Sequence, residues 1–295
     1  MKISNKNKGG VYLPQFLATM RTKITEGFKD DKTPDLKYYA FDWDDNIVHM
    51  PTMIILKDRD GEEVGMSTDD FAEYRQQIGK EDFKYKGRTI VGFAQDPFRN
   101  FRTDGDKDFI IDAMRAKIGP AFNDFREAIN NGSIFSIITA RGHNPNTIKE
   151  AIYNYIINDF NGISKDELVK NLKKYRTFAG EEEMSDNDLI KTYLALNKYH
   201  PVSFGDEKGA ANPEEAKVRA MDEFVDYIKG MAAILNKRAF LKNEIGNKFV
   251  PHIPSIGFSD DDPKNIEVMK KHFKNKPDNI VKTYSTAGGI KKEVK

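Results

Sequence analysis

A short apolar run that ends in three carboxylates constrains this chain more than any other stretch. Residues 38–41 are apolar and aromatic, which is typical of a strand buried on both faces. Asp42, Asp44 and Asp45 follow within four residues. Because aspartate disfavours strand interiors, we expect the strand to end near Asp42. In an open α/β sheet that position opens onto the crevice beyond the carboxyl ends of the strands, where ligands bind.

The three carboxylates need a compensating charge. Like charges held this close repel each other, so a cation or a proton must accompany them. Oxygen ligands alone favour Mg²⁺ among the common cations. However, 46 of the 295 residues are Asp or Glu, so acidic clusters also occur by chance as turns or helix caps. A lone Asp-x-Asp is therefore a weak signal, and the interpretation depends on the other strand ends.

The composition is that of a soluble globular protein, with 39% hydrophobic and 32% charged residues. The net charge of +1 gives no global field that would draw the protein to nucleic acid or to an anionic membrane. The absence of cysteine excludes disulfides, a thiol nucleophile and zinc–thiolate sites. The first ten residues are polar and lysine-rich, unlike a secretory signal, and no run reaches membrane-spanning length. We therefore expect a cytoplasmic protein without a membrane partner.

Two segments near the N-terminus stand apart from the rest. Residues 1–36 carry apolar side chains at helical spacing, which predicts a helical extension packed on the core. Residues 49–119 do not alternate between strand and helix, and we expect a cap-like insert there. Within it, Asp60-Gly61 predicts a hairpin and Ser67 a helix N-cap. Aromatic and basic residues mix over 92–108, which suits a ligand-facing surface, although scattered core aromatics are the more common explanation of such a mixture. Residues 104–108 are expected to form a solvated loop.

Strands and helices alternate regularly from residue 120 onwards. This alternation predicts a parallel sheet with crossover helices, hence an α/β fold. The expected strands after the first are 134–138, 201–204, 255–258 and 280–284. The expected helices are 121–130, 144–156, 212–236 and 266–273, with a polar helical insert over 161–197.

The ends of these strands carry a recognisable set of residues. The end of the first strand and the loop after it read Phe41-Asp42-Trp43-Asp44-Asp45-Asn46-Ile47. The second strand ends in Thr139, and the fourth is followed by Ser259-Asp260-Asp261. Lys217 lies in a helix start between the second and fourth strands. This set resembles the four motifs of the haloacid dehalogenase (HAD) superfamily of phosphohydrolases. Two positions depart from the family pattern, since Asn46 replaces the usual Thr and Asp45 the frequent Gly.

The resemblance implies a Rossmann-like parallel sheet in the HAD-like order 5-4-1-2-3. The core would comprise 37–48 and 120–290, with 49–119 as the cap. The implied function is that of a Mg²⁺-dependent phosphomonoester hydrolase acting through an aspartyl-phosphate. Its substrate would be a phosphorylated small molecule or a nucleotide. A phosphatase of nucleotides or nucleic-acid ends is the nearest alternative, and a non-catalytic binding or assembly protein that retains a metal site is another.

The resemblance also implies roles for individual residues. Asp42 would be the nucleophile, and Asp44 the acid and base. Thr139 and Lys217 would bind phosphoryl oxygens. Mg²⁺ would be held by the Asp42 carboxylate, the Asp44 backbone carbonyl and Asp260, while Asp261 would be a further ligand or would hold a metal-bound water. Arg141 would touch substrate or, equally well, form a surface ion pair, and His143 is expected to be a loop histidine.

Overall fold

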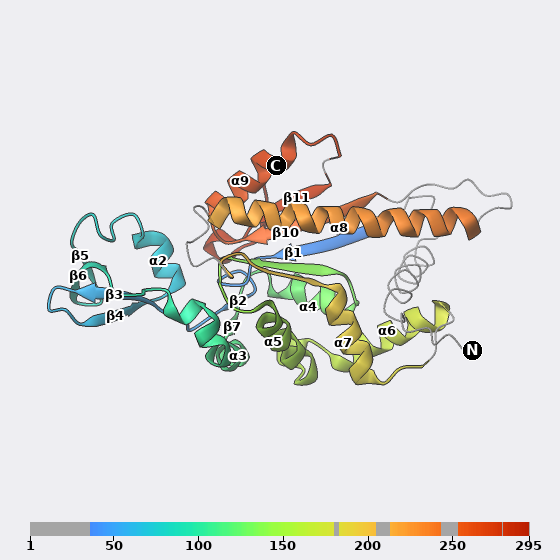
Figure 1. Ribbon diagram of the computed structural model, residues 1–295, viewed down its shortest axis with the longest axis horizontal. Helices are drawn as coiled ribbons and strands as arrows, with labels where there is room; N and C mark the ends of the chain where they lie inside the picture. Colours follow the sequence, from blue (N-terminus) through green and yellow to red (C-terminus); the bar gives the residue numbers. More distant parts are fainter. Residues whose placement is uncertain (1–35, 180–182, 205–212, 243–252, 279, 295) are drawn as a thin grey trace, which may run out of the picture.

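The computed structural model describes residues 36–179, 183–204, 213–242, 253–278 and 280–294 (Figure 1). The helix predicted within residues 1–36 therefore falls outside the described part of the chain. Among the described helices, none is both long enough and apolar enough to cross a membrane.

A mostly parallel six-stranded sheet forms the centre of a mixed α/β fold. Its order is β12-β11-β10-β1-β8-β9, and only β12 pairs antiparallel to its neighbour. The strands are β1 (Leu36–Phe41), β8 (Phe135–Thr139), β9 (Lys198–Pro201), β10 (Pro254–Asp260), β11 (Val281–Ser285) and β12 (Lys292–Glu293). Since β1 lies between β10 and β8, the carboxylate-rich loop that follows β1 begins at the middle of the sheet.

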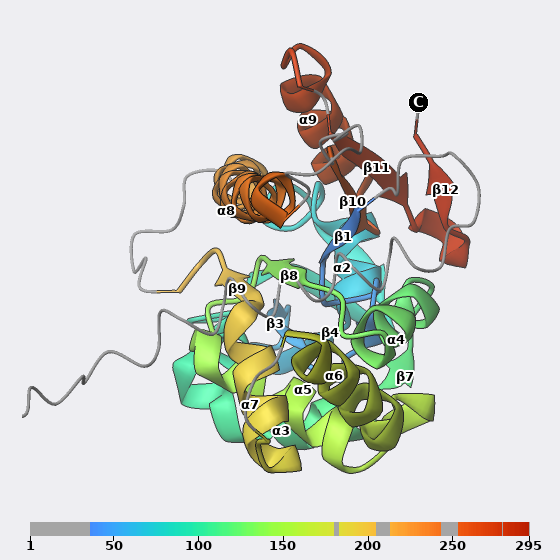
Figure 2. The same cartoon turned by 90° about the vertical axis from the view of Figure 1, so that its right-hand side faces the viewer.

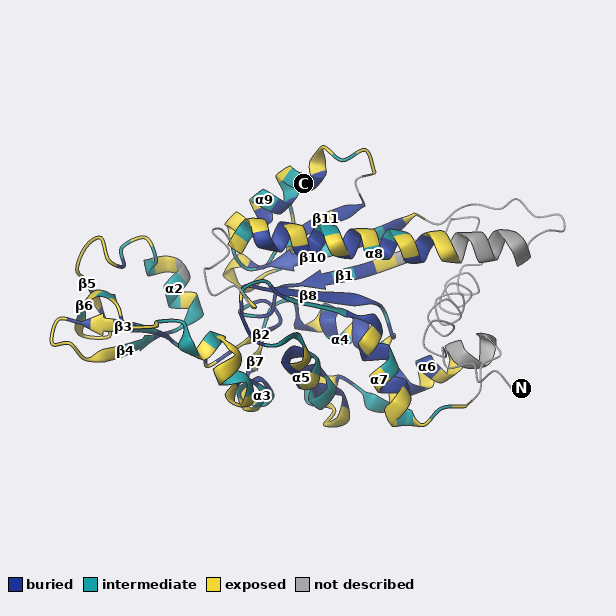
Figure 3. Ribbon diagram, viewed as in Figure 1, coloured by how far each residue is buried: buried dark blue, intermediate teal, exposed yellow. Residues whose placement is uncertain are grey.

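Helices cover both faces of this sheet, which makes three layers (Figure 2). Because both faces are covered, all five residues of β8 are buried, as expected for a central parallel strand (Figure 3). One face carries α8 (Pro213–Lys242) and α9 (Pro263–Lys274). The other carries α4 (Phe122–Asn130), α5 (Pro145–Ile157), α6 (Lys165–Ala179) and α7 (Asp186–Leu196).

Local signals set the ends of these helices where the sequence predicted them. The side chain of Asn144 accepts a hydrogen bond from the Asn146 amide and caps α5, with Pro145 in its first turn. Gly132 follows α4 at φ 68°, a left-handed conformation that glycine adopts without strain. Asp262 caps α9 in the same way as Asn144 caps α5. The predicted helices after residue 120 are thus confirmed, although α8 continues to Lys242.

The segment 49–119 has a sheet and an apolar cluster of its own, and it projects beyond the carboxyl ends of the main strands (Figure 1). The predicted hairpin at Asp60-Gly61 is confirmed by the antiparallel pairing of β3 with β4. A two-stranded pair, β2 with β7, joins the segment to the core. Its elements are β2 (Val48–His49), β3 (Ile54–Asp58), β4 (Glu63–Met66), α2 (Thr68–Tyr74), β5 (Phe83–Tyr85), β6 (Arg88–Phe93), α3 (Asp106–Arg115) and β7 (Lys117–Ile118).

Two sequence predictions were wrong in detail. The third parallel strand is β9 (Lys198–Pro201), three residues earlier than the predicted 201–204. Pro201 ends this strand because proline has no N–H to continue the ladder. The expected solvated loop 104–108 instead contains a short 3₁₀ turn, Thr103–Gly105, and the start of α3 at Asp106.

Candidate active site

Three carboxylates meet at the carboxyl ends of two neighbouring parallel strands. Asp42 follows β1 and Asp260 ends β10, and the register pairs Phe41 with Ser259, so both carboxylates reach the same edge of the sheet. Asp42, Asp260 and Asp261 can each present one oxygen within 4.8 Å of the others. Asp42 and Asp260 are buried and Asp261 is half-buried. The acidic cluster therefore consists of Asp42, Asp260 and Asp261, without the carboxylates of Asp44 and Asp45.

Lys217 lies between the carboxylates of Asp42 and Asp260. It extends from the N-terminal part of α8, and its Nζ donates to Asp42 Oδ1 at 2.9 Å and to Asp260 Oδ2 at 2.8 Å. Only 3% of its side chain is exposed. The Asn265 amide on α9 donates to both oxygens of Asp260, at 2.9 and 3.1 Å. Elements from one face of the sheet thus hold the lysine and orient the acidic strand end.

The electrostatics of the cluster follow from its burial. Burial raises the pKa of Asp42 to about 8, with Asp260 and Asp44 adding to the rise and Lys217 opposing it. Burial, followed by repulsion from Asp260 and Asp42, raises the pKa of Asp261 to about 9. Burial alone would lower the pKa of Lys217, but attraction to Asp260 and Asp42 outweighs it and holds that pKa above its ordinary value. Lys217 therefore remains an ammonium.

The donor set suits a hard divalent cation. Three carboxylates against one ammonium leave two negative charges when all groups are ionised. A group of oxygen ligands with no nitrogen or sulfur is the chemistry that Mg²⁺ prefers. Because burial and mutual repulsion raise the pKa values of Asp42 and Asp261, the cluster keeps its full negative charge near neutral pH only with a compensating cation.

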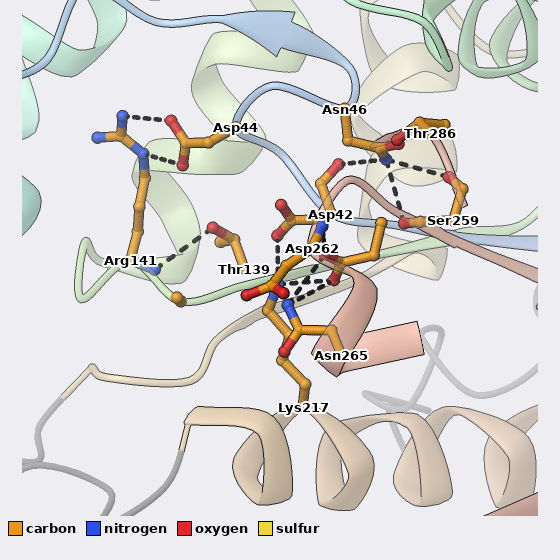
Figure 4. A network of polar contacts seen from close by, with 12 residues as sticks. Asp42, Asp44, Asn46, Thr139, Arg141, Lys217, Ser259, Asp262, Asn265 and Thr286 are labelled. Carbon is orange, nitrogen blue, oxygen red and sulfur yellow. Dashed lines mark hydrogen bonds and ion pairs between the residues drawn. The ribbon is translucent and has the colours of Figure 1, made fainter. Parts of the chain in front are cut away.

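Asp44 points to a different partner from the cluster (Figure 4). Its carboxylate forms a bidentate pair with Arg141, whose Nε and Nη2 donate at 2.8 and 2.7 Å. Its carboxylate is not among the three of the acidic cluster. Arg141 is 1% exposed, so this is a buried ion pair and not the surface pair that the sequence allowed. Thr139 ends β8 at the same edge of the sheet, and its hydroxyl accepts the Arg141 amide at 3.3 Å.

Asn46 joins three strand ends, a role that the sequence did not reveal. Its side-chain nitrogen donates to the backbone oxygens of Asp42 and Ser259, at 3.0 and 3.1 Å, and to the Ser259 hydroxyl at 3.0 Å. Its oxygen accepts from the Thr286 hydroxyl at 2.9 Å. Asn46 is fully buried, so these contacts satisfy a side chain that would otherwise destabilise the core.

Asp45 adopts a left-handed conformation in the loop after Asp42. Asp45 has a φ of 52°, a left-handed conformation that favours glycine and that Asp tolerates better than most residues. Its carboxylate accepts from the Thr68 hydroxyl at 2.6 Å and contacts His49 Nδ1 at 2.8 Å. Asp45 thus links the loop to α2 of the insert.

A second contact brings the insert to the acidic strand end. Arg75, which follows α2, lies 3.2 Å from Asp262 through Nη1 and Oδ2. Asp262 lies two residues beyond Asp260. Sequence reasoning missed Arg75 because no local motif marks a contact between residues so far apart in the chain.

Searches against protein-family models, curated proteins and solved structures match none of them to this chain. The functional conclusion therefore depends on the residues of the site and their chemistry.

Proposed function

We propose that this protein is a Mg²⁺-dependent phosphomonoester hydrolase of the HAD type, with Asp42 as the nucleophile. One observation carries the proposal. A buried carboxylate follows the central parallel strand, held by a buried lysine at 2.9 Å and placed beside two further acids. A nucleophilic carboxylate, an anchored cation and a cluster of oxygen ligands are what phosphoryl transfer to a side chain requires.

The reaction uses Asp42 and Asp44 in turn. An oxygen of Asp42 forms a bond to phosphorus while the bond from phosphorus to the leaving oxygen breaks, and Asp44 supplies the proton to that oxygen. Water then attacks the aspartyl-phosphate, Asp44 takes a proton from the water, and inorganic phosphate leaves with the Asp42 carboxylate restored. The bidentate pair with Arg141 uses one lone pair on each oxygen of Asp44, so each oxygen keeps another for this exchange.

Lys217 and Thr139 bind the phosphoryl group in this proposal. The contacts to Asp42 and Asp260 use two of the three N–H donors of Lys217, and we assign the third to a phosphoryl oxygen. Asp42, Asp260, Asp261 and the backbone carbonyl of Asp44 would hold Mg²⁺. When bound, the ion neutralises the carboxylates and the charge that develops on the phosphoryl oxygens.

Two features of the fold support the proposal. The parallel strands lie in the order β11-β10-β1-β8-β9, which corresponds to the order 5-4-1-2-3 that the resemblance implies. The segment 49–119 leaves the core directly after the Asp42 loop and returns to that loop through Thr68 and Asp45, as a cap would.

Release of inorganic phosphate from a panel of esters tests the proposal. The panel contains sugar phosphates, nucleotides and oligonucleotides phosphorylated at either end, each with Mg²⁺ and with chelator. We expect turnover that requires Mg²⁺ and that Asp42→Asn abolishes, while Asp60→Asn in the β3–β4 turn retains it. Mg²⁺-dependent stabilisation with no turnover of any ester would favour the non-catalytic binding protein instead.

A further inference from the structure

The guanidinium of Arg141 is enclosed by residues of the insert 49–119. Its Nη2 donates to the Thr52 hydroxyl at 3.0 Å, in addition to its bond to Asp44. The rings of Phe101 and Phe109 lie 4.7 and 5.1 Å from the guanidinium carbon. Aromatic faces attract a buried guanidinium and fix its plane. The insert therefore surrounds the cation that holds Asp44.

His143 completes this enclosure, and its protonation state follows from its partners. It is fully buried, with Nε2 at 3.1 Å from Arg141 Nη1 and Nδ1 at 2.9 Å from Asp106 Oδ1. Because a guanidinium only donates, Nε2 must accept and the ring proton must lie on Nδ1, which donates to Asp106. Burial and then the charge of Arg141 lower the pKa of His143, in agreement with a neutral ring. His143 lies in the loop between β8 and α5, as predicted, but it is buried there.

We propose that His143, Asp106 and Thr52 are positioning residues that hold the Arg141 guanidinium and, through it, the carboxylate of Asp44. This inference rests on the proposed function. It gives the insert a part in the proton-transfer step, since both Asp106 and Thr52 belong to 49–119.

The physical reason is that Asp44 has a long and flexible partner. An arginine side chain retains several rotatable bonds, and each must be fixed before a bidentate pair sets the plane of the carboxylate. Nη1 donates to His143, and Nη2 donates to both Thr52 and Asp44. Nε donates to the other oxygen of Asp44, so every nitrogen of the guanidinium has a partner. Loss of the contact to His143 or to Thr52 allows the guanidinium to rotate. The carboxyl group of Asp44 then moves away from the leaving oxygen, and proton transfer to that oxygen slows.

Two substitutions of His143 separate positioning from general structure. Glutamine reaches the place of Nε2 and offers a carbonyl oxygen to Arg141, whereas asparagine reaches only the place of Nδ1 and loses that acceptor. Each variant is assayed on 4-nitrophenyl phosphate, whose leaving group departs without protonation, and on an alkyl phosphate, whose leaving group needs the proton of Asp44. We expect His143→Asn to lower kcat/KM for the alkyl ester about tenfold or more and to leave kcat/KM for the aryl ester nearly unchanged, because kcat/KM covers only the steps up to phosphoryl transfer to Asp42, and acid catalysis contributes about 10²–10⁴ to that transfer. The later hydrolysis step, in which Asp44 is the base for both esters, affects kcat and not kcat/KM. His143→Gln should restore most of the loss.

The outcomes distinguish this inference from the proposed function. Equal losses of kcat/KM on both esters, or a glutamine variant no better than asparagine, would overturn the positioning role while wild-type turnover preserves the phosphatase. Wild-type protein that turns over neither ester would overturn the function and, with it, the positioning role. If His143→Asn gives no cooperative melting transition, Thr52→Val carries the test, since it removes the acceptor of Nη2 while keeping the side-chain shape. It should show the same selective loss on the alkyl ester, and uniform loss would refute the inference.

Discussion

Replacing Lys217 by methionine removes the ammonium that lies between two buried carboxylates. Its Nζ contacts Asp42 and Asp260 at 2.9 and 2.8 Å, and its side chain is 3% exposed, so water has little access to replace it. Removing one partner of a buried ion pair costs about 3–5 kcal/mol. At about 2 °C per kcal/mol for a chain of this size, the melting temperature should fall by about 6–10 °C. Phosphatase activity should fall about a hundred- to thousand-fold, as for loss of an oxyanion donor.

The matched variant Asp42→Asn should not destabilise the protein as Lys217→Met does. Asp42→Asn removes a carboxylate whose pKa burial has raised to about 8, while Lys217 keeps its contact with Asp260. In slightly alkaline buffer with chelator, this variant should be as stable as wild type or more so. The double variant Asp42→Asn, Lys217→Met should recover part of the loss caused by Lys217→Met, because the two side chains are in direct contact.

Thermal melting and urea unfolding of wild type, Lys217→Met, Asp42→Asn and the double variant test whether Lys217 stabilises the two carboxylates. A Lys217→Met protein that melts at the wild-type temperature, with chelator and with Mg²⁺, would refute the reasoning. So would a double variant that is less stable than either single variant.

Three further predictions concern the cation, the loop and the insert. Asp42 and Asp261 have folded pKa values near 8 and 9 against an ordinary 3.8, so the folded state binds more protons than the unfolded state between these limits. The stability that these two groups contribute without a cation is therefore lost as the pH rises from about 4 to about 9. The gain in melting temperature on adding Mg²⁺ should consequently grow with pH, and a gain that is independent of pH would contradict this. Gly119→Ala should destabilise by about 1–3 kcal/mol, because its Cβ would lie 2.5 Å from a backbone oxygen of the Asp42 loop, whereas Gly92→Ala meets nothing within 4 Å and should melt like wild type. Arg75→Ala should change the ratio of kcat/KM values among the esters of the panel, and a uniform change would assign Arg75 to structure alone.

The parts of the site that depend on parallel-strand geometry were predictable from sequence. Asp42 and Asp260 each follow a buried apolar run, and parallel strands bring their carboxyl ends to one edge. Lys217 was predictable because Pro213 and two acids mark a helix start that fixes its place on α8. The strand at Lys198–Pro201 was misplaced because it is short and contains Lys198 and His200, so it lacks the continuous apolar run that marks a buried strand.

The contacts that join the insert to the core could not be predicted. His143 lies 37 residues from Asp106, and Arg141 lies 89 residues from Thr52, so no local period or spacing relates them. Asn46 reads as a conservative replacement in a loop, yet it bonds to Ser259 and Thr286, more than two hundred residues away. Such pairs depend on how the insert and the last strands fold back onto the Asp42 loop.

Chemical trapping of the intermediate tests the central claim most directly. Wild-type protein is mixed with a substrate from the panel and Mg²⁺, quenched in acid during turnover and treated with borohydride, which reduces an aspartyl-phosphate to homoserine. Peptide mass spectrometry then locates the modified residue. We predict homoserine at position 42, dependent on substrate and on Mg²⁺. Turnover with no modification at position 42, or with modification at another carboxylate, would contradict the assignment of Asp42 as the nucleophile.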